Sequence, residues 1–190
     1  MSEHDWPRRI AVIGTSGSGK TTFARRVAAA VAAPHIELDA IFHQPDWVPA
    51  ERDVFRAHVT EAIAGPAWVT DGNYTSFLRD IIWPAADTIV WLDYPFRVVI
   101  WRLFGRTMGR AVKREELWNS NRESLRGHFF TRQSLFLWAK NTHWKHRREW
   151  LPQLDSPPMA HVRVVRLRSP KAAEAWLRQF EATARVRSPS

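Results

Sequence analysis

The chain has 190 residues, of which 45% are hydrophobic and 25% are charged. This balance predicts one globular domain and excludes a largely disordered chain. The sequence contains no cysteine, which excludes disulfides and thiolate metal sites and fits a reducing cytoplasm. The formal net charge of +9 predicts an anionic partner, either nucleotide phosphates or nucleic acid. The longest apolar region, Ile89 to Leu103, contains Asp93 and Arg97, so we do not expect it to span a membrane.

Strands and helices are expected to alternate along the chain, which predicts a parallel sheet with helices on both faces. Apolar, β-branched runs predict strands at residues 9–13, 35–38, 67–70, 88–92 and 161–167. Helical spacing predicts helices at 20–32, 50–64, 75–83 and 170–184, with a frayed end from about residue 185. The segment 97–153 is mostly helical in pattern, with breaks expected at 107–114 and near Gly127. A loop is expected after the second strand.

Residues 14–21 read GTSGSGKT and lie between a predicted strand and a predicted helix. This is the Walker A pattern in its required context, in which glycines let successive backbone N–H groups turn toward phosphate. Lys20 is expected to bridge the β- and γ-phosphates and Thr21 to hold Mg²⁺. The sequence therefore predicts an α/β P-loop fold of three layers, with ATP and Mg²⁺ as cofactors. The predicted nucleotide-binding residues are Gly14, Thr15, Ser16, Gly17, Ser18, Gly19, Lys20, Thr21 and Thr22.

Three aspartates are expected at the carboxyl edge of the sheet, where folds of this kind bind ligands. Asp93 ends the fourth strand as a Walker B carboxylate would, beside Thr21, and is a candidate for ordering Mg²⁺. Asp71 ends the third strand and competes for that role. Asp39 follows the second strand and is a candidate for contact with a Mg²⁺-bound water or with the acceptor. Asp39 or Asp71 would accept the proton of an acceptor hydroxyl.

Four segments, GTSGSGKTT, LDAIFHQPDW, WVTDGNY and IVWLDYP, carry a family resemblance. The chain resembles adenylate kinase-like P-loop proteins of the DNA-topology-modulation (FlaR-type) group, within the nucleoside monophosphate and shikimate kinase superfamily. The resemblance covers roughly residues 8–180 and implies a single domain, 1–190, with a helical LID over about 105–150. Asn73 and Tyr74 stand where adenylate kinases have Phe-Pro-Arg. The arginine that clamps the acceptor phosphate in that family is missing there, which argues against AMP as the acceptor.

The segment WRLFGR, residues 101–106, is similar to the start of the adenylate kinase LID. This likeness implies that Arg102 lies near the ATP base and that Arg106 reaches the phosphates. Arginines recur at 102, 106, 110 and 114, so a continuous helix would place four positive charges on one face, favouring a bound anion. The alternative is a solvated basic face. In related kinases the loop after the last strand passes the adenine, which makes Arg168 and Ser169 candidate adenine contacts.

The segment that follows the LID position is basic and aromatic. Arg122, Arg126 and Arg132 are candidate phosphate contacts by position, and Lys145 to Arg148 is expected to be a solvated helix end. His143 and His146 lie three residues apart without an evident third ligand, so we do not expect a zinc site.

Three functions remain open from the sequence. The first is an ATP- and Mg²⁺-dependent phosphotransferase acting on a small molecule or nucleotide, with Lys20, Arg102, Arg106, Asp39 and Asp71 as catalytic candidates. The second is a nucleotide-gated regulatory or nucleic-acid-binding protein, which the basic and aromatic residues of 118–150 motivate. The third is a hydrolase that uses water as the acceptor. Neither the acceptor nor the oligomeric state follows from the sequence.

Overall fold

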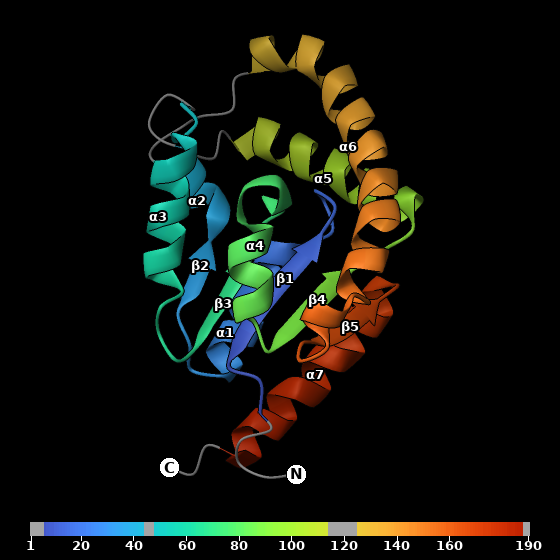
Figure 1. Cartoon of the computed structure of the whole chain (residues 1–190). Helices are drawn as coiled ribbons and strands as arrows, with labels where there is room; N and C mark the ends of the chain where they lie inside the picture. The colour runs from blue at the N-terminus through green and yellow to red at the C-terminus, as the bar shows by residue number, and fades with distance from the viewer. Residues whose placement is uncertain (1–5, 44–47, 114–124, 188–190) are drawn as a thin grey trace.

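The computed structural model of the chain describes residues 6–43, 48–113 and 125–187, with the backbone alone described for 106–113 and 125–139. Five parallel strands form one sheet in the order β2-β3-β1-β4-β5 (Figure 1). The strands are β1 (Arg9–Gly14), β2 (His35–Glu37), β3 (Trp68–Asp71), β4 (Thr88–Leu92) and β5 (Arg163–Leu167). The predicted five-stranded parallel sheet is confirmed.

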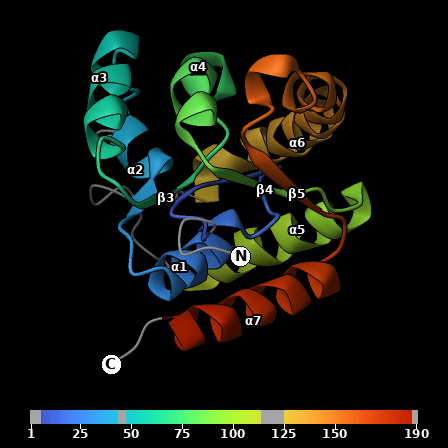
Figure 2. The ribbon, with the colours of Figure 1, turned by 60° about the horizontal axis from the view of Figure 1, so that its bottom comes forward.

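Helices cover both faces of the sheet, which gives the three layers predicted from the sequence. The helices are α1 (Lys20–Ala30), α2 (Leu38–Phe42), α3 (Arg52–Ala62), α4 (Thr75–Ala85), α5 (Phe96–Lys113), α6 (Leu125–Leu154) and α7 (Pro170–Arg187), with a 3₁₀ helix η4 (Pro157–Met159). Figure 2 shows α3, α4 and α6 on one face and α1, α5 and α7 on the other. β1 lies between β3 and β4, so the loop that follows β1 opens at the middle of the sheet.

Each face of the sheet has its own apolar core. Under α3, α4 and α6, buried side chains such as Phe55, Leu78 and Trp150 pack on the sheet. On the opposite face, Val27 of α1 and Leu177 of α7 pack against the other side chains of the same strands. The strands of such a doubly covered parallel sheet are apolar on both sides, which explains why β1 and β4 read as continuous hydrophobic runs.

The helices differ from the predicted ones at four places. A short helix, α2, replaces the loop expected after β2. α5 continues to Lys113 through the break expected at 107–114, and α6 continues through Gly127. α7 continues past the expected fraying point to Arg187. One glycine costs a helix only about 1 kcal/mol relative to alanine, so Gly127 alone does not end a helix of 30 residues.

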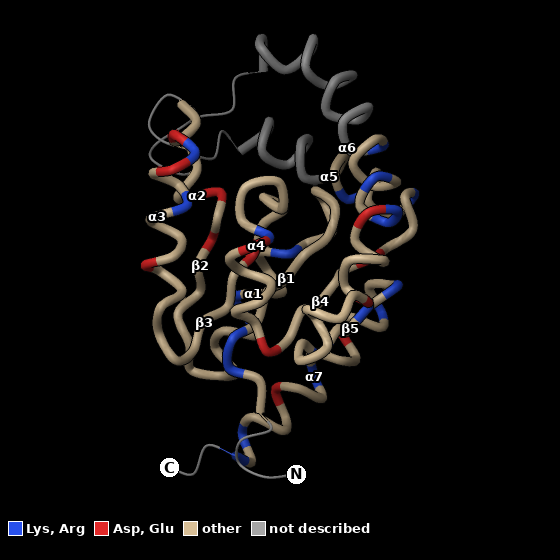
Figure 3. Tube along the Cα trace, viewed as in Figure 1, with Lys and Arg blue, Asp and Glu red and all other residues tan. Residues whose placement is uncertain are grey.

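Basic residues recur along the described half of α6 and on β5, as Figure 3 shows. These elements lie at the β4–β5 side of the sheet, so part of the +9 charge of the chain gathers there. Within the described residues, no helix combines the length and apolar character that crossing a membrane would require.

Candidate functional site

The phosphate loop, residues 14–21, joins the end of β1 to the start of α1. Its turn is closed by a hydrogen bond from the Ser18 N–H to the Thr15 carbonyl, at 3.0 Å. Gly17 has φ +85°, and a Cβ there would lie 3.0 Å from the Val99 carbonyl oxygen on α5. Only glycine combines this backbone conformation with this close approach. Gly19 caps α1 without a side-chain hydrogen bond, so the helix N-terminus offers its backbone N–H groups to an anion.

The Lys20 side chain folds back over the phosphate loop. Its Nζ donates to the Gly14 carbonyl at 2.8 Å and lies 3.5 Å from the Thr15 carbonyl. Asn73, which follows β3, donates from Nδ2 to the same Gly14 carbonyl at 2.5 Å and accepts from the Gly14 N–H at 3.3 Å. Asn73 therefore ties the end of β3 to the phosphate loop, a role that the sequence analysis did not assign to it.

Asp71 is the carboxylate that contacts the phosphate loop. The Thr21 hydroxyl donates to its Oδ2 at 2.7 Å, and His35 of β2 lies 2.9 Å from its Oδ1. Asp71 is 2% exposed and pairs in register with Val12 of β1, which explains how the end of β3 reaches the start of α1.

Asp93 directly follows β4, on the other side of β1, and is held by two arginines. Arg147 of α6 donates from Nε to its Oδ1 at 2.6 Å. Arg166 of β5 donates from Nε and Nη2 to its Oδ2, at 2.8 and 2.6 Å. Asp93 is 3% exposed, so these are buried, charge-assisted hydrogen bonds. The structure thus gives the two candidate metal ligands different partners, Thr21 for Asp71 and a pair of guanidinium groups for Asp93.

Arg102 lies beside the phosphate loop, on α5. Its Nη1 donates to the Ser18 carbonyl at 2.9 Å, and its guanidinium lies 5.4 Å from the centre of the Tyr94 ring. A Cβ on Gly19 would lie 3.2 Å from Arg102 Nη1. A second positive group, besides Lys20, therefore lies at the N-terminus of α1, where a phosphate group would face both.

The remaining predicted nucleotide contacts are spread more widely. Thr22 is exposed on α1, and Arg168 is exposed after β5. The Ser169 hydroxyl accepts from the Ala172 N–H at 3.1 Å, so this side chain caps the start of α7. The side chains of the other arginines proposed for phosphate contact fall outside the described residues; these are Arg106, Arg110, Arg114, Arg122, Arg126 and Arg132.

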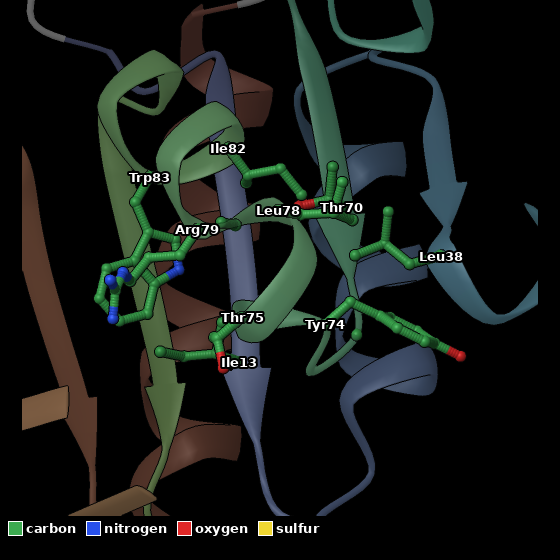
Figure 4. A pocket seen from close by; sticks show the side chains of 11 residues that line it. Ile13, Leu38, Thr70, Tyr74, Thr75, Leu78, Arg79, Ile82 and Trp83 are labelled. Atoms are coloured by element: carbon green, nitrogen blue, oxygen red, sulfur yellow. The ribbon is translucent and has the colours of Figure 1, made fainter. Parts of the chain in front are cut away.

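Asp39 lies on α2 and accepts a hydrogen bond from the Tyr74 hydroxyl at 2.6 Å. Burial, followed by the charge of Asp39, raises the pKa of Tyr74, so its hydroxyl stays protonated and continues to donate. Figure 4 shows the Tyr74 hydroxyl turned away from a small cavity beneath α4 that Thr70 and Leu78 line. That cavity has a volume of about 20 Å³, which is room for about one water molecule.

A larger cavity, of about 600 Å³, lies between α4 and α6. Asn73 and Thr75 line it from the start of α4, and His146 and Thr142 line it from α6. Because Asn73 also bonds Gly14, this cavity adjoins the phosphate loop. Arg79 and Gln153 also line it, and Arg79 Nη1 donates a hydrogen bond to Gln153 Oε1 at 2.8 Å. We refer to it as the α4–α6 cavity.

The C-terminal half of α6 contributes three side chains whose partners the sequence analysis did not identify. His143 Nδ1 lies 3.2 Å from the Thr15 hydroxyl of the phosphate loop, and His146 is buried beside Trp150. Arg147 binds Asp93. The prediction of a solvated helix end over 145–148 is therefore wrong at His146 and Arg147. Their spacing of three to four residues from His143 places all three on one helix face, which is the signal that could have found them.

No family model matches the chain, and no curated protein matches it. Solved structures, however, match the chain in fold. A crystal structure of a shikimate kinase from Bacteroides thetaiotaomicron is 15% identical, with a TM-score of 0.57 over 94% of this chain and 99% of that one. The chain has the fold of a P-loop kinase. A gluconokinase from Sinorhizobium meliloti 1021 is 21% identical, with a TM-score of 0.48 over 97% of this chain and 99% of that one.

A P-loop kinase fold implies a nucleoside triphosphate and a divalent cation, and the residues present fit both. Ser18 Oγ is buried in the phosphate loop without a hydrogen-bond partner in the described structure, and the start of α1 has no side-chain cap. The Thr21–Asp71 pair offers a hydroxyl and a carboxylate to Mg²⁺. Among the described residues, no group of three or more His, Asp or Glu side chains is placed to hold a metal ion.

Proposed function

We propose that this protein is an ATP- and Mg²⁺-dependent phosphotransferase that acts on a small molecule. The observation that carries the proposal is the position of the α4–α6 cavity beside a phosphate loop whose lysine, hydroxyl and carboxylate are already assembled. ATP supplies the phosphoryl group, which passes to an acceptor hydroxyl to give ADP, the phosphorylated acceptor and one proton. Catalysis of this reaction consists mainly of positioning and charge neutralisation, so a site without a covalent nucleophile suits it.

Four residues of this chain have roles on the nucleotide side in the proposal. Lys20 moves its ammonium group from the Gly14 carbonyl to phosphate oxygens, and Arg102 adds a second positive charge above the start of α1. Thr21 and Asp71 hold Mg²⁺, since their oxygens lie 2.7 Å apart next to the phosphate loop. Arg106 is proposed as a further phosphate contact, on the family resemblance alone.

The acceptor hydroxyl needs a group that takes its proton. We assign this role to Asp39, because both oxygens of Asp71 already accept hydrogen bonds, from Thr21 and His35. Asp39 lies at the same edge of the sheet, and Tyr74 fixes the orientation of its carboxylate. Asn73 lines the α4–α6 cavity and Tyr74, the next residue, bonds Asp39, so the proposal requires the acceptor hydroxyl to extend from the cavity past these two residues toward Asp39.

Nucleic-acid binding has less support than phosphoryl transfer. Arg147, one of the basic residues of 118–150 that motivated this alternative, is committed to Asp93. Trp144, which is 53% exposed, lies 5.6 Å from the Arg147 guanidinium and so faces a group that is already paired. Neither residue is presented as a free stacking or phosphate-binding group.

The test is an assay of ADP formation from ATP and Mg²⁺ with a panel of shikimate, gluconate, glycerol and AMP, each against a blank without acceptor. We expect acceptor-dependent ADP formation by the wild type and by the control Lys171→Ala, which changes an exposed lysine on α7. We expect Lys20→Ala to lower this rate by a factor of about 100, since a charge-assisted contact to phosphate contributes up to ~3 kcal/mol. Equal rates for Lys20→Ala and the wild type, or no acceptor dependence with any compound, overturn the proposal. ADP formation in the blank alone indicates a hydrolase.

A further inference from the structure

α6 brings two buried histidines to the edge of the phosphate loop. His143 is 2% exposed and is bound to Thr15 through Nδ1. His146 is 6% exposed, lines the α4–α6 cavity and is not used in the proposed reaction. A polar side chain this deeply buried normally has partners for its polar atoms, so the surroundings of His146 bear on its role.

Packing fixes the orientation of the His146 ring. The ring stacks on Trp150, one turn further along α6, with centroids 3.9 Å apart and planes inclined by 15°. Trp150 in turn packs edge-on against Trp83 of α4 and Trp91 of β4. Trp150 therefore holds the imidazole directly, and Trp83 and Trp91 hold Trp150 in the core.

Burial and neighbouring positive charges keep the His146 ring neutral. Desolvation, then the charge of Lys20, then those of Lys145 and His143, lower its pKa to about 3. Lys20 faces His146 from the phosphate loop, and Lys145 and His143 face it from its own helix. The ring therefore carries one proton, on one of its two nitrogens, throughout the physiological range.

The proton belongs on Nε2. Nδ1 is enclosed and has no hydrogen-bond partner in the described structure. An enclosed N–H without a partner is rarer in proteins than an enclosed acceptor without one, so the N–H is expected on the other nitrogen. Nε2 is then the nitrogen left to meet a molecule in the α4–α6 cavity.

We propose that His146 is a neutral hydrogen-bond donor of the acceptor site, whose Nε2–H binds an oxygen atom of the acceptor in the α4–α6 cavity. The proposal rests on the proposed function, because it needs an acceptor in that cavity. It adds a specificity-determining residue that selects an acceptor with an oxygen atom placed to accept from Nε2–H. Proton removal stays with Asp39, because a ring that does not bind a proton near neutral pH is a poor base.

The test compares three substitutions at one position. His146→Phe keeps a ring stacked on Trp150 and removes the donor. His146→Gln places an amide N–H near the Nε2 position, and His146→Asn has a polar group that reaches only the Nδ1 position. His58→Gln, on the exposed surface of α3, is the control. KM and kcat are measured for ATP and for whichever panel compound the wild type phosphorylates, together with the melting temperature.

We expect His146→Phe and His146→Asn to raise the acceptor KM about tenfold, the loss of one hydrogen bond. The KM for ATP should stay within twofold of the wild type, and His146→Gln should recover most of the acceptor KM. An unchanged acceptor KM in His146→Phe overturns the proposal, and so does a rise confined to the KM for ATP. If the wild type phosphorylates no compound of the panel, that result overturns the proposed function rather than the role of His146.

A spectroscopic measurement tests the proposal without catalysis. In the full chain with ¹⁵N-labelled histidine, we expect the Nε2–H tautomer of His146 from pH 6 to pH 8. Shikimate or gluconate, added with Mg²⁺ and a non-hydrolysable ATP analogue, should shift its Nε2 signal in a saturable way. A proton on Nδ1, or a shift produced by the ATP analogue with no further change from either acid, overturns it.

Discussion

Asp93→Asn should mainly lower stability and Asp71→Asn should mainly weaken binding of the Mg²⁺ complex, because the two carboxylates have different partners. Asp93 accepts three charge-assisted hydrogen bonds from Arg147 and Arg166 and is 3% exposed. Neutralising it leaves two guanidinium groups facing each other across an amide. Breaking a buried ion pair costs roughly 3–5 kcal/mol. The arginine side chains are 28% and 26% exposed, so water relieves part of this cost, and we expect about 2–3 kcal/mol.

For a domain of this length each kcal/mol lowers the melting temperature by about 2–4 °C, so Asp93→Asn should melt roughly 5–10 °C below the wild type. Its affinity for a Mg²⁺-bound ATP analogue should stay within about threefold. Asp71→Asn keeps an oxygen that can accept from Thr21, so its melting temperature should fall by only a few degrees. Its affinity for the Mg²⁺ complex should fall at least tenfold, because the carboxylate proposed for the ion has lost its charge.

Differential scanning calorimetry and isothermal titration calorimetry measure the two effects separately. Asp155→Asn, at an exposed position just after α6, is the control for both. The reasoning is refuted if Asp93→Asn melts with the wild type and loses Mg²⁺-dependent binding. It is refuted equally if Asp71→Asn binds the Mg²⁺ complex as the wild type does.

Three further changes have defined outcomes. Gly17→Ala should destabilise the chain by about 1–2 kcal/mol in urea unfolding and weaken binding of the ATP analogue, since φ +85° and the Val99 carbonyl both oppose a Cβ. Gly65→Ala is the control and should be near neutral in the same unfolding experiment, because its Cβ would meet nothing closer than 3.9 Å. Between pH 7 and pH 5 the free energy of unfolding should fall by up to about 2 kcal/mol on account of His146. Its folded pKa of about 3 lies below the unfolded value of 6.5, so the unfolded chain binds the proton first as the pH falls. The fall should be smaller in His146→Phe, and an equal fall in that variant would contradict the reasoning. Tyr74→Phe should lower kcat more than it raises the KM for ATP, because the hydroxyl orients Asp39 alone; unchanged kcat would contradict it.

The fold could be predicted because its signals are local. The strands and the phosphate loop are continuous segments whose residue types report their own environment, since a strand buried on both faces is apolar throughout. β4 begins and ends at the predicted residues, and α1 begins at Lys20 as predicted. The errors lie where tertiary contacts outweigh local preference. α2 begins at Leu38, the last residue of the predicted second strand, and continues into the predicted loop, and the burial of Leu38 holds its start.

The geometry of the candidate site could be predicted only where it lies within one segment. Asp71 and Asp93 are equivalent by sequence, since each ends an apolar strand that neighbours β1. What distinguishes them is the presence of Arg147 and Arg166, which are distant in sequence and reach Asp93 alone. The histidines were tested only for metal spacing, and their partners, Thr15 and the α4–α6 cavity, come from the packing of α6 across the sheet. Such long-range pairings leave no mark in a local pattern.

The face of α6 that meets the sheet connects the parts of the site. His143 contacts the phosphate loop, His146 lines the cavity, and Arg147 binds the end of β4. Trp150, one turn beyond His146, is 1% exposed and anchors this stretch of helix in the core. Because the four side chains share one rigid helix, α6 cannot shift along its axis without breaking the Thr15 and Asp93 contacts together.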